Sequence, residues 1–150
     1  IIMSLGNIFD IAGSAMSAQS IRLNTTASNI ANAESASSSI DETYRARKPF
    51  FAVMHNEFLN VNKDNEFHNK GENLGAGVEV LGIVESDAPL QPRFQPDHPL
   101  ANEEGYVYYP NVNVVEEMTD MMSSSRSYQM NVEVLKTAKQ MLQRTLMLGQ

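Results

Sequence analysis

Cysteine and tryptophan are both absent from this chain of 150 residues. Without cysteine there is no disulfide, thiolate metal ligand or thiol nucleophile, although this absence leaves the redox compartment open. No stretch approaches the ~20 apolar residues of a membrane span. Residues 1–16 also lack the basic head and continuous apolar segment of a secretory signal peptide. We therefore expect no membrane anchor and no cleavable signal peptide.

Positive charge is scarce as well. Eleven Lys and Arg stand against eighteen Asp and Glu, a formal net charge of −7, whereas nucleic acids and anionic lipids attract a basic surface. The charge is uneven, since residues 1–40 hold only Asp10, Arg22 and Glu34. The composition therefore excludes a typical nucleic-acid-binding protein and indicates a long N-terminal segment that is polar but almost uncharged.

The N-terminal segment could be a disordered arm, but its spacing favours a helix. Apolar, small and uncharged polar residues recur at steps of four and three, the a and d positions of a heptad. The spacing predicts a helix from residue 5 to about residue 32. Its seam consists of Leu5, Phe9, Ala12, Met16, Gln19, Leu23, Thr26 and Ile30.

The C-terminal segment shows the same alternation over more than four heptads. Asn113 is a suitable N-cap, Glu116 and Glu117 follow in the first turns where the helix dipole favours anions, and Gly149 is expected to end the helix. Six of the nine methionines lie in this segment, and they could fill a core or adapt to several neighbours. The predicted seam is Val114, Met118, Met121, Ser125, Tyr128, Val132, Leu135, Lys139, Leu142 and Leu146.

The predicted helices are too long for one globule. At ~1.5 Å per residue they measure about 42 and 53 Å, while a compact chain of this length has a diameter of roughly 38 Å. We expect them to pair as an antiparallel, coiled-coil-like hairpin whose remaining apolar faces are covered by other subunits.

Short segments between the helices are typical of strands, namely 44–54, 77–85 and 106–109. Five of the six prolines lie in 89–110, which is therefore extended, and 55–76 is expected to be an exposed loop. The fold class is α+β. We divide the chain into an N-terminal helical part (1–40), a small β-rich module with a Pro-rich arm (41–112), carried at one end of the hairpin, and a C-terminal helix (113–150).

Residues for catalysis are not arranged in a recognisable pattern. His55, His68 and His98 fit no zinc spacing, and a metal site built from His55 and His68 with nearby glutamates would need the loop to fold back. Ser123–Ser125 lies on a predicted helix without a nucleophile elbow. We expect no enzymatic activity, no metal and no cofactor.

Two stretches resemble the bacterial flagellar axial proteins, the rod and hook family. Residues 27–33 read Ala-Ser-Asn-Ile-Ala-Asn-Ala, which is similar to the family's N-terminal signature, and residues 3–19 resemble the start of a proximal-rod member. Residues 96–99 (Pro-Asp-His-Pro), 105–118, 125–129 and 146–150 resemble the pattern of the same member. The resemblance covers about two thirds of the chain. A departure lies at 33–35, where Ala-Glu-Ser replaces the Asn-Thr-Pro-Gly-Tyr continuation of other members.

The resemblance implies a structural subunit of the flagellar proximal rod. In this family the terminal helices pack into the inner core of a tube that crosses the periplasm and transmits motor torque, and the chain leaves the cell unfolded through the flagellar type III export apparatus. Implied partners are further copies, homologous rod proteins and rod-base or membrane-ring components.

The residues expected to mediate assembly lie on the two seams and beside them. Arg126 could equally be a plain surface residue, and the asparagines are expected to cap or end elements through side-chain-to-backbone hydrogen bonds. An alternative function is a helical-hairpin adaptor or secretion chaperone that binds a single partner. The candidate assembly residues are Leu5, Phe9, Met16, Leu23, Asn29, Ile30, Asn32, Asn111, Val114, Met118, Met121, Arg126, Tyr128, Val132, Leu135, Leu142 and Leu146.

Overall fold

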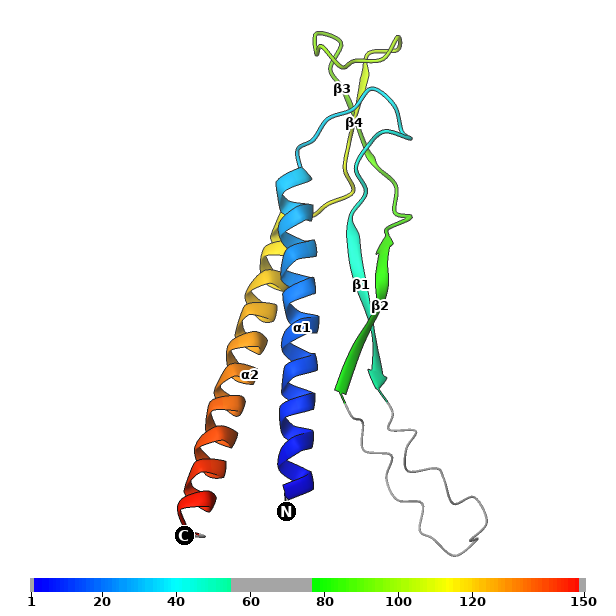
Figure 1. Cartoon of the computed structure of the whole chain (residues 1–150). Coiled ribbons are helices and arrows are strands. Elements are labelled where there is room, and N and C mark those ends of the chain that lie inside the picture. The colour runs from blue at the N-terminus through cyan, green and yellow to red at the C-terminus, as the bar shows by residue number, and fades with distance from the viewer. Residues whose placement is uncertain (1, 55–76, 149–150) are drawn as a thin grey trace, which may run out of the picture. The chain divides into compact units, whose positions relative to one another are not determined.

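The computed structural model describes residues 2–54 and 77–148, and their side chains from residue 6 to residue 147. The predicted loop 55–76 and the helix stop at Gly149 lie outside the described residues, as do the histidines of the hypothetical metal site. The elements follow one another along the chain (Figure 1) as α1 (Ile2–Asn32), β1 (Arg47–Met54), β2 (Gly77–Glu85), β3 (Gln91–Phe94), β4 (Tyr106–Tyr109) and α2 (Val114–Leu148).

The predicted α+β class is confirmed, with one long helix near each end and short strands between them. The expected segments 77–85 and 106–109 form β2 and β4 with the predicted bounds, and β1 begins at Arg47 rather than at residue 44. The Pro-rich stretch is extended, as predicted, but it also contains the unpredicted strand β3. Antiparallel pairing of β3 with β4, from Gln91–Tyr109 to Phe94–Tyr106, tolerates Pro92 in this short strand.

The start of α2 confirms the predicted cap. The Asn113 side-chain oxygen Oδ1 accepts a hydrogen bond from the Val115 amide at 3.1 Å, and the Glu117 amide donates to the Asn113 carbonyl at 3.0 Å. The first bond satisfies a donor that a helix N-terminus otherwise leaves unpaired, and the second is the first main-chain bond of the helix.

The chain forms two compact units, and each long helix contributes to both. The first unit comprises 1–19, 51–81 and 127–150, and the second comprises 20–50 and 82–126. In the first unit, the buried residues include three alanines, Ala12, Ala18 and Ala138, each at most 4% exposed. Such small side chains let neighbouring backbones lie close together.

In the first unit β2 begins against α1. The Val78 amide donates to the Ser14 hydroxyl at 3.1 Å, and that hydroxyl donates to the Ile11 carbonyl at 3.0 Å. Gly77 precedes this contact with a φ of 151°, and a Cβ atom at this position would collide with Ser14 Oγ. Glycine is therefore required by the close approach of the strand to the helix.

The second unit contains a small β structure with its own core. Ser37 and Tyr108 exchange backbone hydrogen bonds of 3.0 and 2.9 Å, which joins the segment after α1 to β4. Val107 is fully buried, and Phe94 contacts Tyr106 edge-on with ring centroids 5.4 Å apart.

β2 starts beside Ser14 in the first unit, and β1 starts beside Asn29 in the second unit. The division into 1–40, 41–112 and 113–150, with the β-rich module at one end of the hairpin, stays a prediction. Within the part of the chain that the structure describes, neither long helix is apolar enough to cross a membrane.

Candidate functional site

A buried asparagine holds three segments of the second unit together. Asn29 on α1 is 1% exposed. Its Oδ1 accepts hydrogen bonds from the Arg47 amide (2.9 Å) and the Tyr44 hydroxyl (2.9 Å). Its Nδ2 donates to the Arg47 carbonyl (2.8 Å) and to Glu117 Oε1 on α2 (3.0 Å). We call Asn29, Tyr44, Arg47 and Glu117 the asparagine clamp.

The clamp uses the full hydrogen-bonding capacity of the amide. A primary amide offers two donors and an oxygen with two lone pairs, and Asn29 employs all four. It pairs with both the N–H and the C=O of Arg47, as a neighbouring strand would. An aspartate lacks the donors for two of these bonds, so residue 29 requires an amide.

Burial sets the electrostatics of the clamp. Burial raises the pKa of Glu117, which is 4% exposed; the hydrogen bond from Asn29 and the charge of Lys48 oppose this rise, while Asp120 and Glu116 add to it. Burial also raises the pKa of Tyr44, against the opposing charge of Arg47. The Glu117 carboxylate is therefore held by hydrogen bonding at a position that disfavours its charge.

The basic residues around the start of β1 are engaged within the second unit. Arg47 Nη2 lies 2.9 Å from Glu85 Oε1, and Lys48 Nζ lies 3.2 Å from Glu116 Oε1. Arg45 Nη1 donates to the Ser86 carbonyl at 3.2 Å. Each of the two ion pairs joins half-exposed side chains, so these pairs fix geometry more than they add stability.

A second asparagine fastens the chain next to α2. Asn111 Oδ1 accepts from the Ala46 amide at 2.8 Å, and its Nδ2 donates to the carbonyls of Ser86 (3.2 Å) and Ala88 (2.9 Å). The predicted side-chain-to-backbone bonding of the asparagines is thus confirmed, but only Asn113 caps a helix start. Asn29 and Asn111 instead hold the segments that flank β1 and β2.

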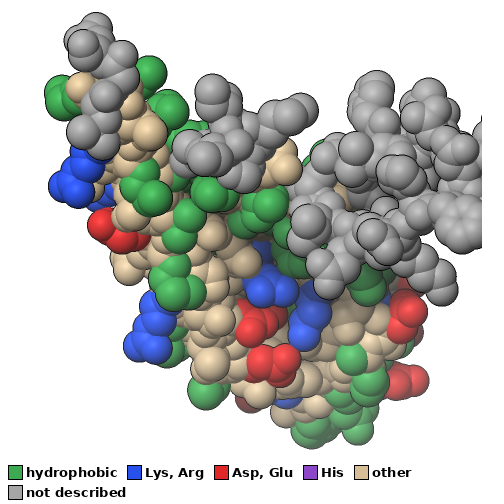
Figure 2. Space-filling model, turned by 90° about the horizontal axis from the view of Figure 1, so that it is seen from below, with side chains coloured by type: hydrophobic (Ala, Val, Ile, Leu, Met, Phe, Trp, Pro, Cys, Tyr) green, Lys and Arg blue, Asp and Glu red, His purple; other side chains and the backbone are tan. Residues whose placement is uncertain are grey.

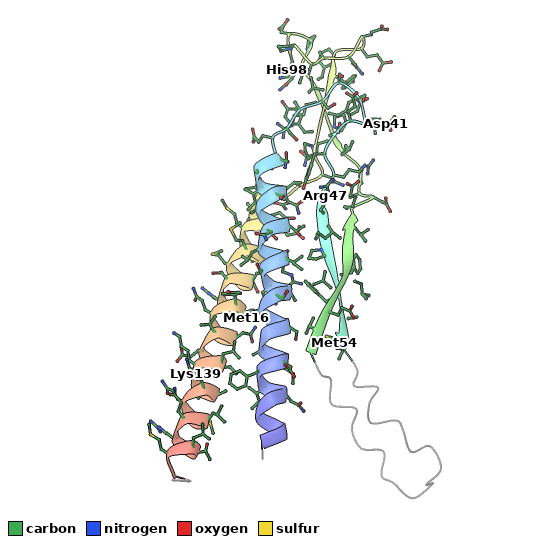
Figure 3. The ribbon with its side chains drawn as sticks, in the orientation of Figure 1. Met16, Asp41, Arg47, Met54, His98 and Lys139 are labelled. Atoms are coloured by element: carbon green, nitrogen blue, oxygen red, sulfur yellow. The ribbon has the colours of Figure 1, made fainter. Side chains whose placement is uncertain are left out.

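The helices of the first unit enclose an open apolar groove of about 320 Å³. Six of its seven lining residues belong to the predicted seams, and the seventh is Lys136. Figure 3 labels Met16 on α1 and Lys139 on α2. Figure 2, which views the molecule from below, shows hydrophobic side chains exposed among basic and acidic ones. The groove residues are Phe9, Met16, Tyr128, Val132, Leu135, Lys136 and Lys139.

The covered face of α2 differs by one residue per heptad from the predicted seam. In the second unit Glu117 and Ser124 are buried, whereas Met118 is 52% exposed. In the first unit Ala138 is buried, whereas Lys139 and Leu146 are exposed. Met121, Leu135 and Leu142 are half-buried and belong to both patterns. The physical reason is that small or hydrogen-bonded side chains permit closer packing than methionine.

The remaining candidate residues divide by burial. Leu23, Ile30 and Val114 are half-buried, and Arg126 is exposed. Asn32 donates to the Ser28 carbonyl at 2.8 Å. The side chain of Leu5 lies outside the described residues. Their role in assembly stays a prediction.

Sequence reasoning missed Tyr44 and Glu117 as partners of Asn29. Glu117 lies four residues before Met121, and that spacing could have placed it on the covered face. Tyr44 carries no such signal. Among residues 2–54 and 77–148 no three histidine, aspartate or glutamate side chains gather where a metal ion could bind.

Comparison with known proteins relates both ends of the chain to flagellar rods. Residues 9–34 match the family model described as flagella basal body rod protein, and residues 103–148 match the model of the flagellar basal body rod FlgEFG protein C-terminal region. The flagellar basal-body rod protein FlgC of Salmonella typhimurium is 48% identical over 148 residues, which cover 99% of this chain and all of the relative. The FlgC proteins of Yersinia enterocolitica and Borreliella burgdorferi are 49% and 32% identical, over 99% and 96% of this chain and 100% and 97% of the relatives.

Proposed function

Because the chain belongs to the FlgC family of flagellar basal-body rod proteins, it is a structural subunit of the rod, and we propose that its terminal helices mediate assembly into the proximal part of that rod. The relatives named above are structural rod proteins and not enzymes. They give no support to the alternative, a helical-hairpin adaptor or secretion chaperone.

Exposed apolar side chains carry this proposal. On α2, Met122, Met130, Met141 and Met147 are 57%, 64%, 59% and 79% exposed. On α1, Ile8 and Ile11 are 38% and 41% exposed. Exposed apolar surface on a folded chain indicates an interaction site where it is contiguous, and a rod provides neighbours that cover such side chains.

The seventeen candidate residues have different parts in this proposal. Leu23, Asn29, Ile30, Asn32, Asn111, Val114, Met121 and Leu142 hold the chain's own fold together. Phe9, Met16, Tyr128, Val132 and Leu135 line the groove, and Met118, Arg126 and Leu146 are exposed to neighbouring subunits. Leu5 is proposed to extend the α1 seam.

The finer partners and location follow as proposals. The subunit is located in the basal body. We propose that it joins other copies, homologous rod proteins and rod-base or membrane-ring components in the periplasm-spanning rod, where it transmits torque. Export as an unfolded chain through the flagellar type III apparatus fits this location. The proposal includes no catalytic activity, no cofactor, no nucleic-acid partner and no direct insertion into a membrane.

A charge placed in the groove tests the proposal. Leu135→Asp puts a carboxylate among apolar groove residues, and we expect cells that carry it as their only copy to lose swimming motility because the rod fails to assemble. Gln140→Asp introduces the same charge at an exposed position of α2 outside the groove and should leave motility unchanged. Normal swimming with Leu135→Asp would contradict assembly through this surface.

A further inference from the structure

In the first unit α2 carries a second apolar stripe that is separate from the groove. Met130, Val134 and Met141 are 64%, 46% and 59% exposed, and Thr137 lies between them. Positions 130, 134, 137 and 141 follow steps of four, three and four, which is the spacing of a coiled-coil seam. We call these four residues the outer stripe. Nothing within the described residues covers it.

The groove is a concave apolar surface and so is complementary to the outer stripe. Its floor consists of Phe9, Met16, Tyr128, Val132 and Leu135, and its volume of about 320 Å³ is open to solvent. Water molecules bind weakly in an apolar space of this kind, because a water inside a cavity needs two or more polar partners. The groove therefore favours an apolar occupant such as a row of methionine and valine side chains.

Charges beside the two surfaces are also complementary. Glu133 lies next to the outer stripe in sequence, and its side chain is 73% exposed. Lys136 and Lys139 are at the groove. Lys136 Nζ is 3.7 Å from Glu133 Oε2 of the same helix, a loose and exposed pair, while Lys139 has no ion-pair partner among the described residues.

We infer that the outer stripe of one copy packs into the groove of a second copy. Each copy carries both an apolar ridge and a matching groove on one compact unit, so a second copy supplies what each surface lacks. The two surfaces differ, so the contact is head-to-tail, and repetition produces an open helical array rather than a closed pair. This inference rests on the proposed function, because it names the neighbour that covers part of the terminal helices.

Cross-linking in assembled basal bodies tests this contact. The chain has no native thiol, so Val134→Cys on the outer stripe and Met16→Cys in the groove can be produced together, as separate full-length copies with different tags. We expect a short bifunctional thiol reagent to join the two copies. Met122→Cys replaces a methionine of similar exposure, 57%, that lies on neither surface. It should give at least several-fold less product with Met16→Cys.

The outcomes separate this contact from the proposed function. If cells swim but their basal bodies contain no Val134→Cys to Met16→Cys product, the contact is wrong and the proposed function stands. If Val134→Cys is joined only to a different basal-body protein, a second copy is not the occupant. If the unmodified chain is missing from purified basal bodies, the proposed function itself fails.

A charge exchange supplies an independent measurement. Glu133→Lys and Lys139→Glu should each reduce the cross-linked yield by about two- to fivefold, in keeping with the modest strength of exposed ion pairs. The double variant should recover most of the yield because it restores opposite charges across the contact. Arg144→Glu, on the same helix but outside the groove lining, is the matched control. A double variant no better than either single variant would contradict the proposed charge pairing.

Discussion

Replacing Asn29 by aspartate removes two donors while keeping the shape of the side chain. In the native chain Nδ2 donates to the Arg47 carbonyl at 2.8 Å and to Glu117 Oε1 at 3.0 Å. A carboxylate oxygen at that position would face two acceptors, one of them on a carboxyl group. We therefore expect the asparagine clamp to be lost rather than weakened.

The magnitude of the effect follows from burial. A lost hydrogen bond costs about 1 kcal/mol, and a buried acceptor left without a donor costs ~1–3 kcal/mol more. Asn29 and Glu117 are 1% and 4% exposed, so solvent cannot replace the missing donors. Asn29→Asp should reduce the free energy of unfolding by roughly 3–5 kcal/mol, a large fraction of the stability of a small protein.

Urea denaturation of the full-length chain, followed by far-UV circular dichroism, measures this loss. Asn32→Asp is the matched control, because Asn32 donates one bond within α1 to the Ser28 carbonyl and is less buried. Its cost should stay near 1 kcal/mol. Adding Glu117→Gln to Asn29→Asp should restore part of the loss, since the glutamine amide can donate to the new carboxylate. Equal effects of Asn29→Asp and Asn32→Asp, or no recovery in the double variant, would refute the clamp.

Two further predictions concern the same fold. Burial raises the pKa of Glu117, so the native chain loses stability as pH rises through that pKa. Glu117→Gln keeps an acceptor for Asn29 and carries no charge. At pH 7 this variant should be at least as stable as the native chain, and it should lose the advantage at about pH 4 and below. Titration of urea midpoints with pH checks this, and an advantage that grows on acidification would be the wrong sign. Gly77→Ala should cost about 1–3 kcal/mol, because the new Cβ collides with Ser14 Oγ at a positive φ. Gly82→Ala on the same strand, where no described atom lies within 4 Å of a Cβ, should change the unfolding midpoint little.

The two helices could be predicted from local information. Each is long, and its pattern repeats often enough for one odd position not to hide it. The heptad assignment of α2 differs from the packing for a physical reason. Hydrophobicity selected Met118 and Leu146, while packing buries Ser124 and Ala138. A heptad register assigned from apolar residues alone therefore differs from the buried face of the helix when small residues make the closest contacts.

The clamp could not be predicted in the same way because its partners are distant in sequence. Asn29 meets Arg47 across 18 residues and Glu117 across 88. Its presence in the motif at 27–33 singled it out, but the expectation was a capping role. A cap is the commonest local use of asparagine, whereas pairing with another segment's backbone requires the tertiary structure. Strand β3 was missed because proline has no N–H to donate to a neighbouring strand and therefore argues against a strand. It is tolerated here because β3 pairs on one side only, with β4.

The clamp and the outer stripe together explain why this chain places its few charges as it does. Residues 1–40 contain one basic and two acidic residues, so α1 can be enclosed without the desolvation cost of burying ionised groups. The buried carboxyl group of Glu117 accepts a hydrogen bond from the Asn29 amide. The ion pairs of the second unit join the start of β1 to β2 and to α2. The first unit instead leaves its lysines at the rim of an apolar groove. Polar bonding therefore fixes the fold of the second unit, whereas the first unit keeps an open apolar groove with lysines beside it.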